Sequence, residues 1–294
     1  MRYKNLYAIF VAFMLLLVGN SCEDKIDPVI EELNLARVFT PAGFEAKIVN
    51  MTTIELKWDV RDEADHYVVE FSEDSLEFST IIRTVTVDPS QLPIQETFFG
   101  DTRYSARVKA VSATGSGDSK WDALTIRTAP ENILLPIVIP DDIGVFGATL
   151  KWPAGELATR FVINPGNIQR TITTGEVASG EAVITGLNPY TNYTILMYAG
   201  NSQRGNAEFK TLVDPNCATC VKVSAGQDVS DAIAAAAAGS TIVIAPGTYP
   251  DEGTIVVNKD LTVQAEFYYT QPTVYAGFSC ATTVSSFAVK DVVF

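Results

Sequence analysis

The sequence predicts an all-β chain in which two similar units precede a third unit of different pattern. Two short segments that end in Lys-Trp, residues 54–58 and 148–152, alternate apolar and polar side chains as half-buried strands do. Downstream of each lies a second expected strand that begins with tyrosine, at residues 104–110 and 193–199. An alanine-rich stretch and several short β-branched runs follow residue 220, which indicates a change of architecture there.

The first 21 residues have the layout of a signal peptide. Arg2 and Lys4 precede an apolar run, residues 6–18, that is shorter than the roughly 20 residues needed to span a bilayer. Cys22 follows the leader, and residues 22–37 are interpreted as the anchored cysteine and an acidic tether. The alternative is a plain signal peptide in which Cys22 has no special part.

The residues around the cleavage point resemble the lipobox of Bacteroidota lipoproteins. Ser21 precedes Cys22, and the acidic Glu23 and Asp24 come next, although Gly19 stands where that motif usually has Leu or Val. The resemblance implies that the Cys22 sulfur carries a diacylglycerol. It also implies a lipid-anchored place in the outer membrane, at the cell surface, since several acyl chains anchor a protein stably.

Residues 38–130 and 131–213 each read as one β-sandwich, with an early tryptophan and a late tyrosine. Residues 186–193, Gly-Leu-Asn-Pro-Tyr-Thr-Asn-Tyr, are close to the signature that precedes strand F in fibronectin type III domains, and residues 99–104 are a looser version. The resemblance implies two tandem fibronectin type III-like domains. In these, Trp58 and Trp152 would pack in the cores, and a tyrosine corner would begin strand F.

Two aromatic residues of these units are candidates for stacking on a sugar. Trp121 is expected to open the last strand of the first unit, and Tyr190 lies beside a turn in the second. The alternative is that both rings only cover an edge of their sandwich. Fibronectin type III domains serve as spacers or interaction modules, so the fold alone does not choose between these roles.

The third unit, residues 214–294, begins with a strand at 221–223 and an expected helix at 227–238. Asp228 or Ser230 would be the N-cap of the helix, and Gly239 follows its end. Further strands are expected at 241–244, 254–257, 261–263, 273–275, 287–289 and 291–294.

The helix and the Ala-Pro-Gly-Thr-Tyr turn at residues 245–249 resemble the opening of right-handed parallel β-helix proteins of the pectate-lyase type. There a short helix caps the first coil, because the end of a solenoid is an open sheet edge. The resemblance implies that family members place calcium-holding carboxylates and an Arg or Lys base on later coils. The chain as given is therefore expected to hold a truncated start of such a β-helix and no catalytic site. Asp251 and Glu252 are interpreted as solvated turn residues, and Asp291 as part of the open edge.

The remaining cysteines offer no metal site by spacing. Cys217 and Cys220 form a lone Cys-x-x-Cys without a second ligand pair, so either a local disulfide or two free thiols is expected. Cys280 is interpreted as a side chain that fills the solenoid. We expect no cofactor and no metal.

Charge and composition narrow the function further. The net charge of −14 lacks the basic footprint that nucleic-acid binding needs, and the single histidine, His66, leaves little room for triad or zinc chemistry. The leading hypothesis is a non-catalytic lipoprotein that binds or scaffolds polysaccharide for glycan utilisation. Two alternatives stay open: the N-terminal part of a polysaccharide lyase or glycoside hydrolase that lacks its catalytic coils, and an adhesion or protein-interaction module.

Overall fold

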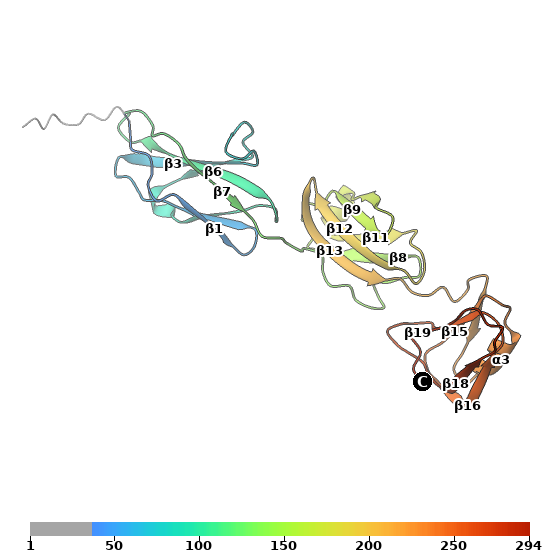
Figure 1. The fold of residues 1–294 in the computed structure, drawn as a ribbon. Helices are drawn as coiled ribbons and strands as arrows, with labels where there is room; N and C mark the ends of the chain where they lie inside the picture. The colour runs from blue at the N-terminus through green and yellow to red at the C-terminus, as the bar shows by residue number, and fades with distance from the viewer. Residues whose placement is uncertain (1–36) are drawn as a thin grey trace, which may run out of the picture.

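The computed structural model describes residues 37–294, which form three units in an extended row (Figure 1). Each unit buries its own hydrophobic cluster. We call the units sandwich 1 (β1 to β7), sandwich 2 (β8 to β13) and the solenoid (β14 to β19). None of the helices in the described part is long and apolar enough to cross a membrane.

Sandwich 1 packs a three-stranded antiparallel sheet against a four-stranded one. The first sheet has the order β1-β2-β5, and the second β4-β3-β6-β7, with the 3-10 helix η1 between β4 and β5. The bounds are β1 Glu45–Val49, β2 Thr53–Lys57, β3 Ala64–Ser72, β4 Arg83–Val87, η1 Pro89–Gln91, β5 Ile94–Thr97, β6 Arg103–Ser112 and β7 Asp122–Arg127.

Sandwich 2 repeats this plan with a shorter first sheet. Strands β11 and β8 pair in one sheet, and the other has the order β10-β9-β12-β13. The bounds are β8 Gly147–Lys151, β9 Arg160–Asn164, β10 Ile168–Thr171, α2 Thr174–Ser179, β11 Glu181–Thr185, β12 Asn192–Ala199 and β13 Ser202–Lys210. The two sheet orders give two fibronectin type III-like sandwiches, as the sequence predicts.

Trp58 and Trp152, which directly follow β2 and β8, are core residues, and this confirms the expectation from the sequence. Trp58 is 5% exposed and Trp152 is 3% exposed. Each indole meets an aromatic ring of the facing strand edge-on: Trp58 lies 5.2 Å from Tyr67, and Trp152 lies 5.9 Å from Phe161, between ring centroids. The alternation seen in the sequence therefore marks the buried face in both units.

The solenoid is built from parallel strands in two sheets, and from β15 to β19 successive strands alternate between them. One sheet has the order β14-β15-β17-β19 and the other pairs β16 with β18. The bounds are β14 Cys220–Val223, α3 Val229–Ala235, β15 Ser240–Ile244, β16 Thr248–Val257, β17 Leu261–Ala265, β18 Thr273–Cys280 and β19 Phe287–Lys290. The strand expected at 291–294 is wrong, since these residues contribute only an isolated bridge between Val293 and Thr273.

Charged side chains from the coil below hold both ends of the capping helix α3. Asp228 is the N-cap residue but its side chain makes no capping bond. Instead the Glu252 carboxylate accepts from the backbone N–H of Val229 and Ser230, both at 2.8 Å. At the other end Lys259 donates to two free carbonyls of the helix. Glu252 is therefore a capping residue of the solenoid, not the solvated turn residue expected, because the chain fold brings it beneath the helix.

The tyrosine of the Pro-Gly-Thr-Tyr turn, Tyr249, makes the contacts that stabilise the first coil. Tyr249 is buried, and its hydroxyl bonds to the carbonyls of Val223 and Ala245, 3.1 and 2.8 Å away. Burial raises the pKa of Tyr249 above its ordinary value. The residue thereby ties the ends of β14 and β15 together within the first coil.

Candidate functional site

Both sandwiches contain a tyrosine corner with the same geometry. In sandwich 1 the backbone N–H of Phe99 donates to the Tyr104 hydroxyl at 3.2 Å, and in sandwich 2 the N–H of Asn188 donates to the Tyr193 hydroxyl at 2.9 Å. Both tyrosines are buried. The loop before strand F is thus fixed from inside in each unit, although residues 99–104 match the sequence signature poorly.

Buried threonines hold the same two loops from the other side. The N–H of Thr102 donates to the Thr128 hydroxyl at 3.0 Å, and the N–H of Thr191 donates to the Thr211 hydroxyl at 2.9 Å. Each buried hydroxyl also donates to the carbonyl of the first residue of its loop, at 2.7 Å in both cases. The two loops, residues 99–104 and 188–193, therefore share one rigid backbone framework, which we call the corner.

One residue of each corner has a left-handed backbone and points a different side chain outward. Asp101 (φ 48°) forms an ion pair with Arg127 at 2.8 Å on the surface of sandwich 1. Tyr190 (φ 49°) holds the matching place in sandwich 2, and the Lys210 ammonium lies 3.3 Å from the centroid of its ring. The backbone is conserved between the copies, while the outward side chain differs.

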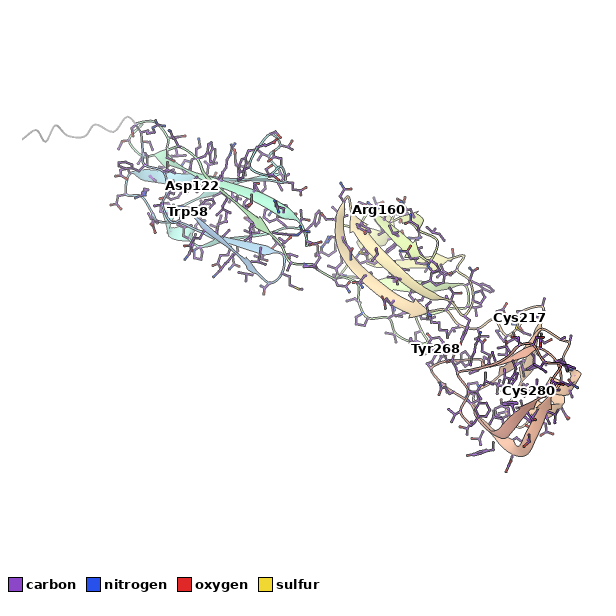
Figure 2. The ribbon with its side chains drawn as sticks, in the orientation of Figure 1. Trp58, Asp122, Arg160, Cys217, Tyr268 and Cys280 are labelled. Atoms are coloured by element: carbon purple, nitrogen blue, oxygen red, sulfur yellow. A yellow bond between two sulfur atoms is a disulfide. The ribbon has the colours of Figure 1, made fainter. Side chains whose placement is uncertain are left out.

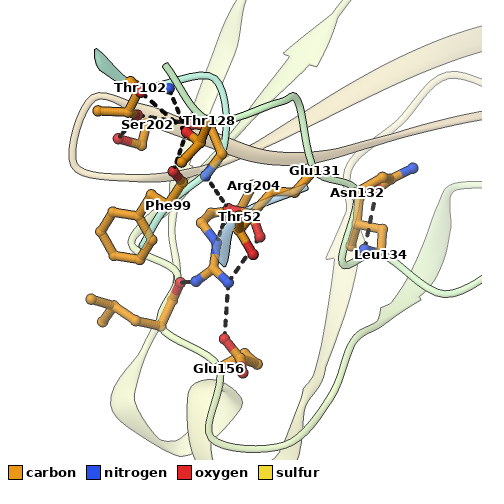
Figure 3. Close-up of polar contacts among 12 residues, drawn as sticks. Thr52, Phe99, Thr102, Thr128, Glu131, Asn132, Leu134, Glu156, Ser202 and Arg204 are labelled. Carbon is orange, nitrogen blue, oxygen red and sulfur yellow. Dashed lines mark hydrogen bonds and ion pairs between the residues drawn. The ribbon is translucent and has the colours of Figure 1, made fainter. Parts of the chain in front are cut away.

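The corner of sandwich 1 contacts sandwich 2 through a buried ion pair (Figure 3). Arg204, in β13, is 6% exposed at its side chain and donates to Glu131 of the connecting segment at 2.8 Å. Glu131 also accepts from the N–H of Gly100 at 2.8 Å, and Arg204 reaches Glu156 and the carbonyl of Leu157. A Cβ on Gly100 would lie 2.8 Å from the connecting segment, so only glycine permits this approach.

Further contacts close this first junction. The Asn132 side chain donates to the carbonyl of Asn206 at 2.9 Å and accepts from its N–H at 3.1 Å, so it pairs with the edge of β13 as a neighbouring strand would. The hydroxyls of Thr102 and Ser202 lie 3.0 Å apart across the junction. The Arg204 guanidinium lies 4.8 Å from the ring centroid of Phe99.

The corner of sandwich 2 contacts the solenoid through Tyr190. Its hydroxyl donates to the Asp291 carboxylate at 2.7 Å, and Lys210 lies 3.4 Å from the same carboxylate. The Tyr268 hydroxyl of the solenoid donates to the carbonyl of Lys210 at 2.9 Å. Burial and the bond to Asp291 raise the pKa of Tyr190 above its ordinary range. Asp291 is thus a contact between units rather than only part of an open edge.

The two stacking candidates have different surroundings. Trp121 precedes β7 rather than opening it, is half-buried, and lies over the Arg107 guanidinium at 4.3 Å, with the Lys109 ammonium at 5.4 Å. Tyr190 has Lys210 and Lys290 against its ring and its hydroxyl bound to the solenoid. Trp121 therefore keeps an outward position on sandwich 1, whereas Tyr190 belongs to the second junction.

Three of the cysteines lie within the described residues. Cys217 and Cys220 form a disulfide where the chain enters the solenoid, and Cys280 lies in the same unit (Figure 2). Cys280 is a free, exposed thiol, so its interpretation as a side chain that fills the solenoid is wrong: the end of β18 turns it outward. Cys22, the candidate lipidation site, lies outside the described residues.

Sequence reasoning did not find Glu131 or Arg204. These two residues are 73 positions apart, so no local pattern marks them as partners. Gly100 is the one available signal, because glycine in a turn can indicate close backbone approach. Within residues 37–294, no group of three or more His, Cys, Asp or Glu side chains is arranged to hold a metal ion.

Comparison with solved structures finds similarity to the sandwich region. A two-domain fibronectin type III segment of chicken tenascin is 17% identical, covers 58% of this chain and 99% of its own length, and has a TM-score of 0.35. The FN1–FN3 domains of chicken CNTN1 are 14% identical over 59% of this chain and 66% of their own (TM-score 0.26). The fn3 domain of the human collagen alpha-1(XX) chain is 22% identical over 32% and 88% (TM-score 0.27). These similarities concern the fold alone.

No protein-family model and no curated protein matches the chain.

Proposed function

We propose that this chain is a lipid-anchored scaffold of the bacterial cell surface, in which two sandwiches form a stalk that holds the solenoid away from the membrane. The order of Arg2, Lys4, the apolar run and Ser21-Cys22 supports anchoring at Cys22 and resembles Bacteroidota lipoproteins. The partner class is polysaccharide in our first hypothesis, and the broader role is that of an interaction or adhesion module.

The observation that carries the scaffold role is that each corner binds the unit that follows it. A corner that served only its own sandwich would not need the bonds from Gly100 and Arg204 to Glu131. It would also not need the bond from Tyr190 to Asp291. Such contacts limit rotation between units, which favours a stalk of defined direction over a flexible tether.

Anchoring is tested by Cys22→Ala. The variant is expected to move from the membrane fraction to the soluble fraction, because the proposed acylation site is lost. Cys280→Ala is the matched control and should remain in the membrane fraction. A Cys22→Ala protein that stays membrane-bound and unprocessed contradicts the lipoprotein proposal.

Polysaccharide binding is supported by the setting of Trp121. Sugars stack on aromatic planes and hydrogen-bond to polar groups beside them. Trp121 lies on the face of sandwich 1 that also carries Arg107, Glu70 and Lys109, with Arg107 bonded to Glu70 at 2.5 Å. On a glycan array the full chain should bind a set of polysaccharides, and Trp121→Ala should lose them while Trp121→Phe retains part. Binding that is indifferent to Trp121→Ala removes this site.

The enzyme alternative is favoured by one feature of the solenoid. Strand β19 has a partner on one side only, and the rings of Phe278, Phe287 and Phe294 cluster next to it, so this edge is suited to continue into another coil. Two carboxylates of the unit have structural partners: Glu266 pairs with Lys222 at 2.6 Å, and Asp260 accepts from the N–H of Ser285 and Ser286. The coding sequence downstream of Phe294 separates the two hypotheses: an in-frame continuation that encodes further coils would support the enzyme, and a stop codon would support the scaffold.

A further inference from the structure

A short turn that the Cys217–Cys220 disulfide closes connects sandwich 2 to the solenoid. The chain before the turn is fixed: the N–H of Leu212 donates to the carbonyl of Gly144, and the carbonyl of Leu212 accepts from the N–H of Tyr190, both at 3.0 Å. The chain after the turn is β14, which begins at Cys220. The conformation of the turn therefore determines how the corner of sandwich 2 leads into the first coil.

The disulfide is the strongest constraint on this turn, residues 214–220. None of the side chains in this range is buried. The N–H of Cys220 donates to the carbonyl of Cys217 at 2.9 Å, and the N–H of Cys217 reaches the carbonyl of Asp214 at 3.4 Å. The N–H of Asn216 donates to the Asp214 carboxylate at 3.0 Å. Hydrogen bonds at such exposed sites compete with water and contribute little net stability, so the covalent bond holds the turn.

The first strand of the solenoid depends on the turn at its start. Strand β14 lies at the edge of its sheet and pairs with β15 alone. Its last residue, Val223, is buried, and the carbonyl of Val223 accepts from the Tyr249 hydroxyl. At the other end the turn presents the carbonyl of Thr219 to the N–H of Thr241 at 2.9 Å. Local opening of this strand would therefore begin at Cys220, where the turn ends.

The disulfide is suited to a local role more than to general stabilisation of the fold. It joins cysteines that are three positions apart. The chain entropy that a cross-link removes from the unfolded state grows with the length of the loop that it closes, so a loop this short gains little. Both cysteines are also partly exposed, which gives a reductant in solution access to the sulfur atoms. The bond is thus placed to open while the solenoid stays folded.

We propose that the Cys217–Cys220 disulfide is a redox-sensitive lock on the second junction, and that its reductant is a dithiol. One thiolate of the dithiol attacks a sulfur of the disulfide, which breaks the S–S bond and forms a mixed disulfide. The second thiol of the dithiol then closes the reductant's own disulfide, so two electrons and two protons pass to Cys217 and Cys220. In the reduced state the turn opens, the start of β14 frays, and the solenoid rotates more freely on sandwich 2.

The test treats the native full chain, in mild detergent, with dithiothreitol. Alkylation by iodoacetamide within residues 37–294 should rise from Cys280 alone to Cys280, Cys217 and Cys220. Amide hydrogen exchange of residues 220–223 and 287–293 should rise at least about threefold, because the start of β14 and the second junction open locally. Exchange in sandwich 1 should not change, and reoxidation of a sample that was not alkylated should restore the original exchange.

Two variants assign the effect to this disulfide. Cys217→Ser combined with Cys220→Ser should exchange like the reduced protein and ignore dithiothreitol, whereas Cys280→Ser should respond as the unaltered chain does. Three results would each overturn the proposal. The disulfide could open only when the whole chain unfolds, or exchange could stay unchanged after both cysteines are reduced. Exchange that rises throughout the solenoid would show that the bond stabilises the whole unit instead of the junction.

Discussion

The two junctions use the same backbone corner but different chemistry to hold the next unit. At the first junction a buried arginine and glutamate join the corner, the connecting segment and sandwich 2. At the second, a half-buried tyrosine, a lysine and an aspartate join the corner to the solenoid. The tyrosine and threonine inside the corner are equivalent in both copies, so other residues account for the different partners: Gly100 and Glu131 at the first junction, and Tyr190 and Lys210 at the second.

This difference indicates how such chains can change architecture without redesigning the sandwich. Buried residues of its own unit hold the backbone of each corner, so the corner keeps the same conformation whatever unit follows it. The left-handed position, Asp101 in one copy and Tyr190 in the other, is free to carry an ion pair or a contact to a different fold. The first junction is the more deeply buried, and we expect it to be the stiffer.

The largest expected effect is at Arg204. Replacing it with Ala leaves Glu131 largely buried without its cation, which typically costs about 3–5 kcal/mol. Urea denaturation should show this loss in the transition of sandwich 2. Lys57→Ala, which removes an exposed pair with Glu45, is the matched control and should change stability by less than about 1 kcal/mol. Similar results for the two variants would show that the first junction is not energetically coupled to folding.

The corners themselves should respond alike. Tyr104→Phe and Tyr193→Phe each remove the acceptor of one loop N–H, which leaves that donor unsatisfied and should cost about 1–3 kcal/mol in its own sandwich. Equilibrium unfolding monitored separately for the two sandwiches measures both values. A loss confined to one copy would break the equivalence that the comparison assumes.

The smallest effect on stability is expected at the second junction. Tyr190→Phe keeps the ring under Lys210 but loses the hydrogen bond to Asp291, so the free energy of unfolding of sandwich 2 should change by about 1 kcal/mol or less. Amide hydrogen exchange around residues 287–293 should nevertheless increase, because the solenoid loses a contact. Tyr198→Phe, on the same strand as the corner tyrosine, is the control. Unchanged exchange in Tyr190→Phe would remove this contact from the account.

Local sequence patterns predicted the fold of each unit. They could not predict residues whose role depends on contacts with distant parts of the chain. Alternation placed Trp58 and Trp152 in the cores, and the tyrosine signature located both corners, because these features depend on neighbours within one strand or turn. Glu252 was misread because its partners, the N–H groups of α3, come from a preceding segment that lies over it only after folding. The junction residues were missed for the same reason.

The central claim is that the contacts at the corners limit rotation between neighbouring units, so that the units form a stiff stalk. The first junction limits this rotation more than the second. The claim is tested most directly by pulsed electron–electron distance measurements between pairs of spin labels in a Cys280→Ser background. One sample carries labelled cysteines in place of Thr84 and Glu181, on either side of the first junction. A second sample carries them in place of Glu181 and Thr254, on either side of the second junction. We expect a narrow distribution across the first junction, a somewhat broader one across the second, and marked broadening of the first alone in Arg204→Ala. A first-junction distribution that is already broad, or that Arg204→Ala leaves unchanged, would contradict the account.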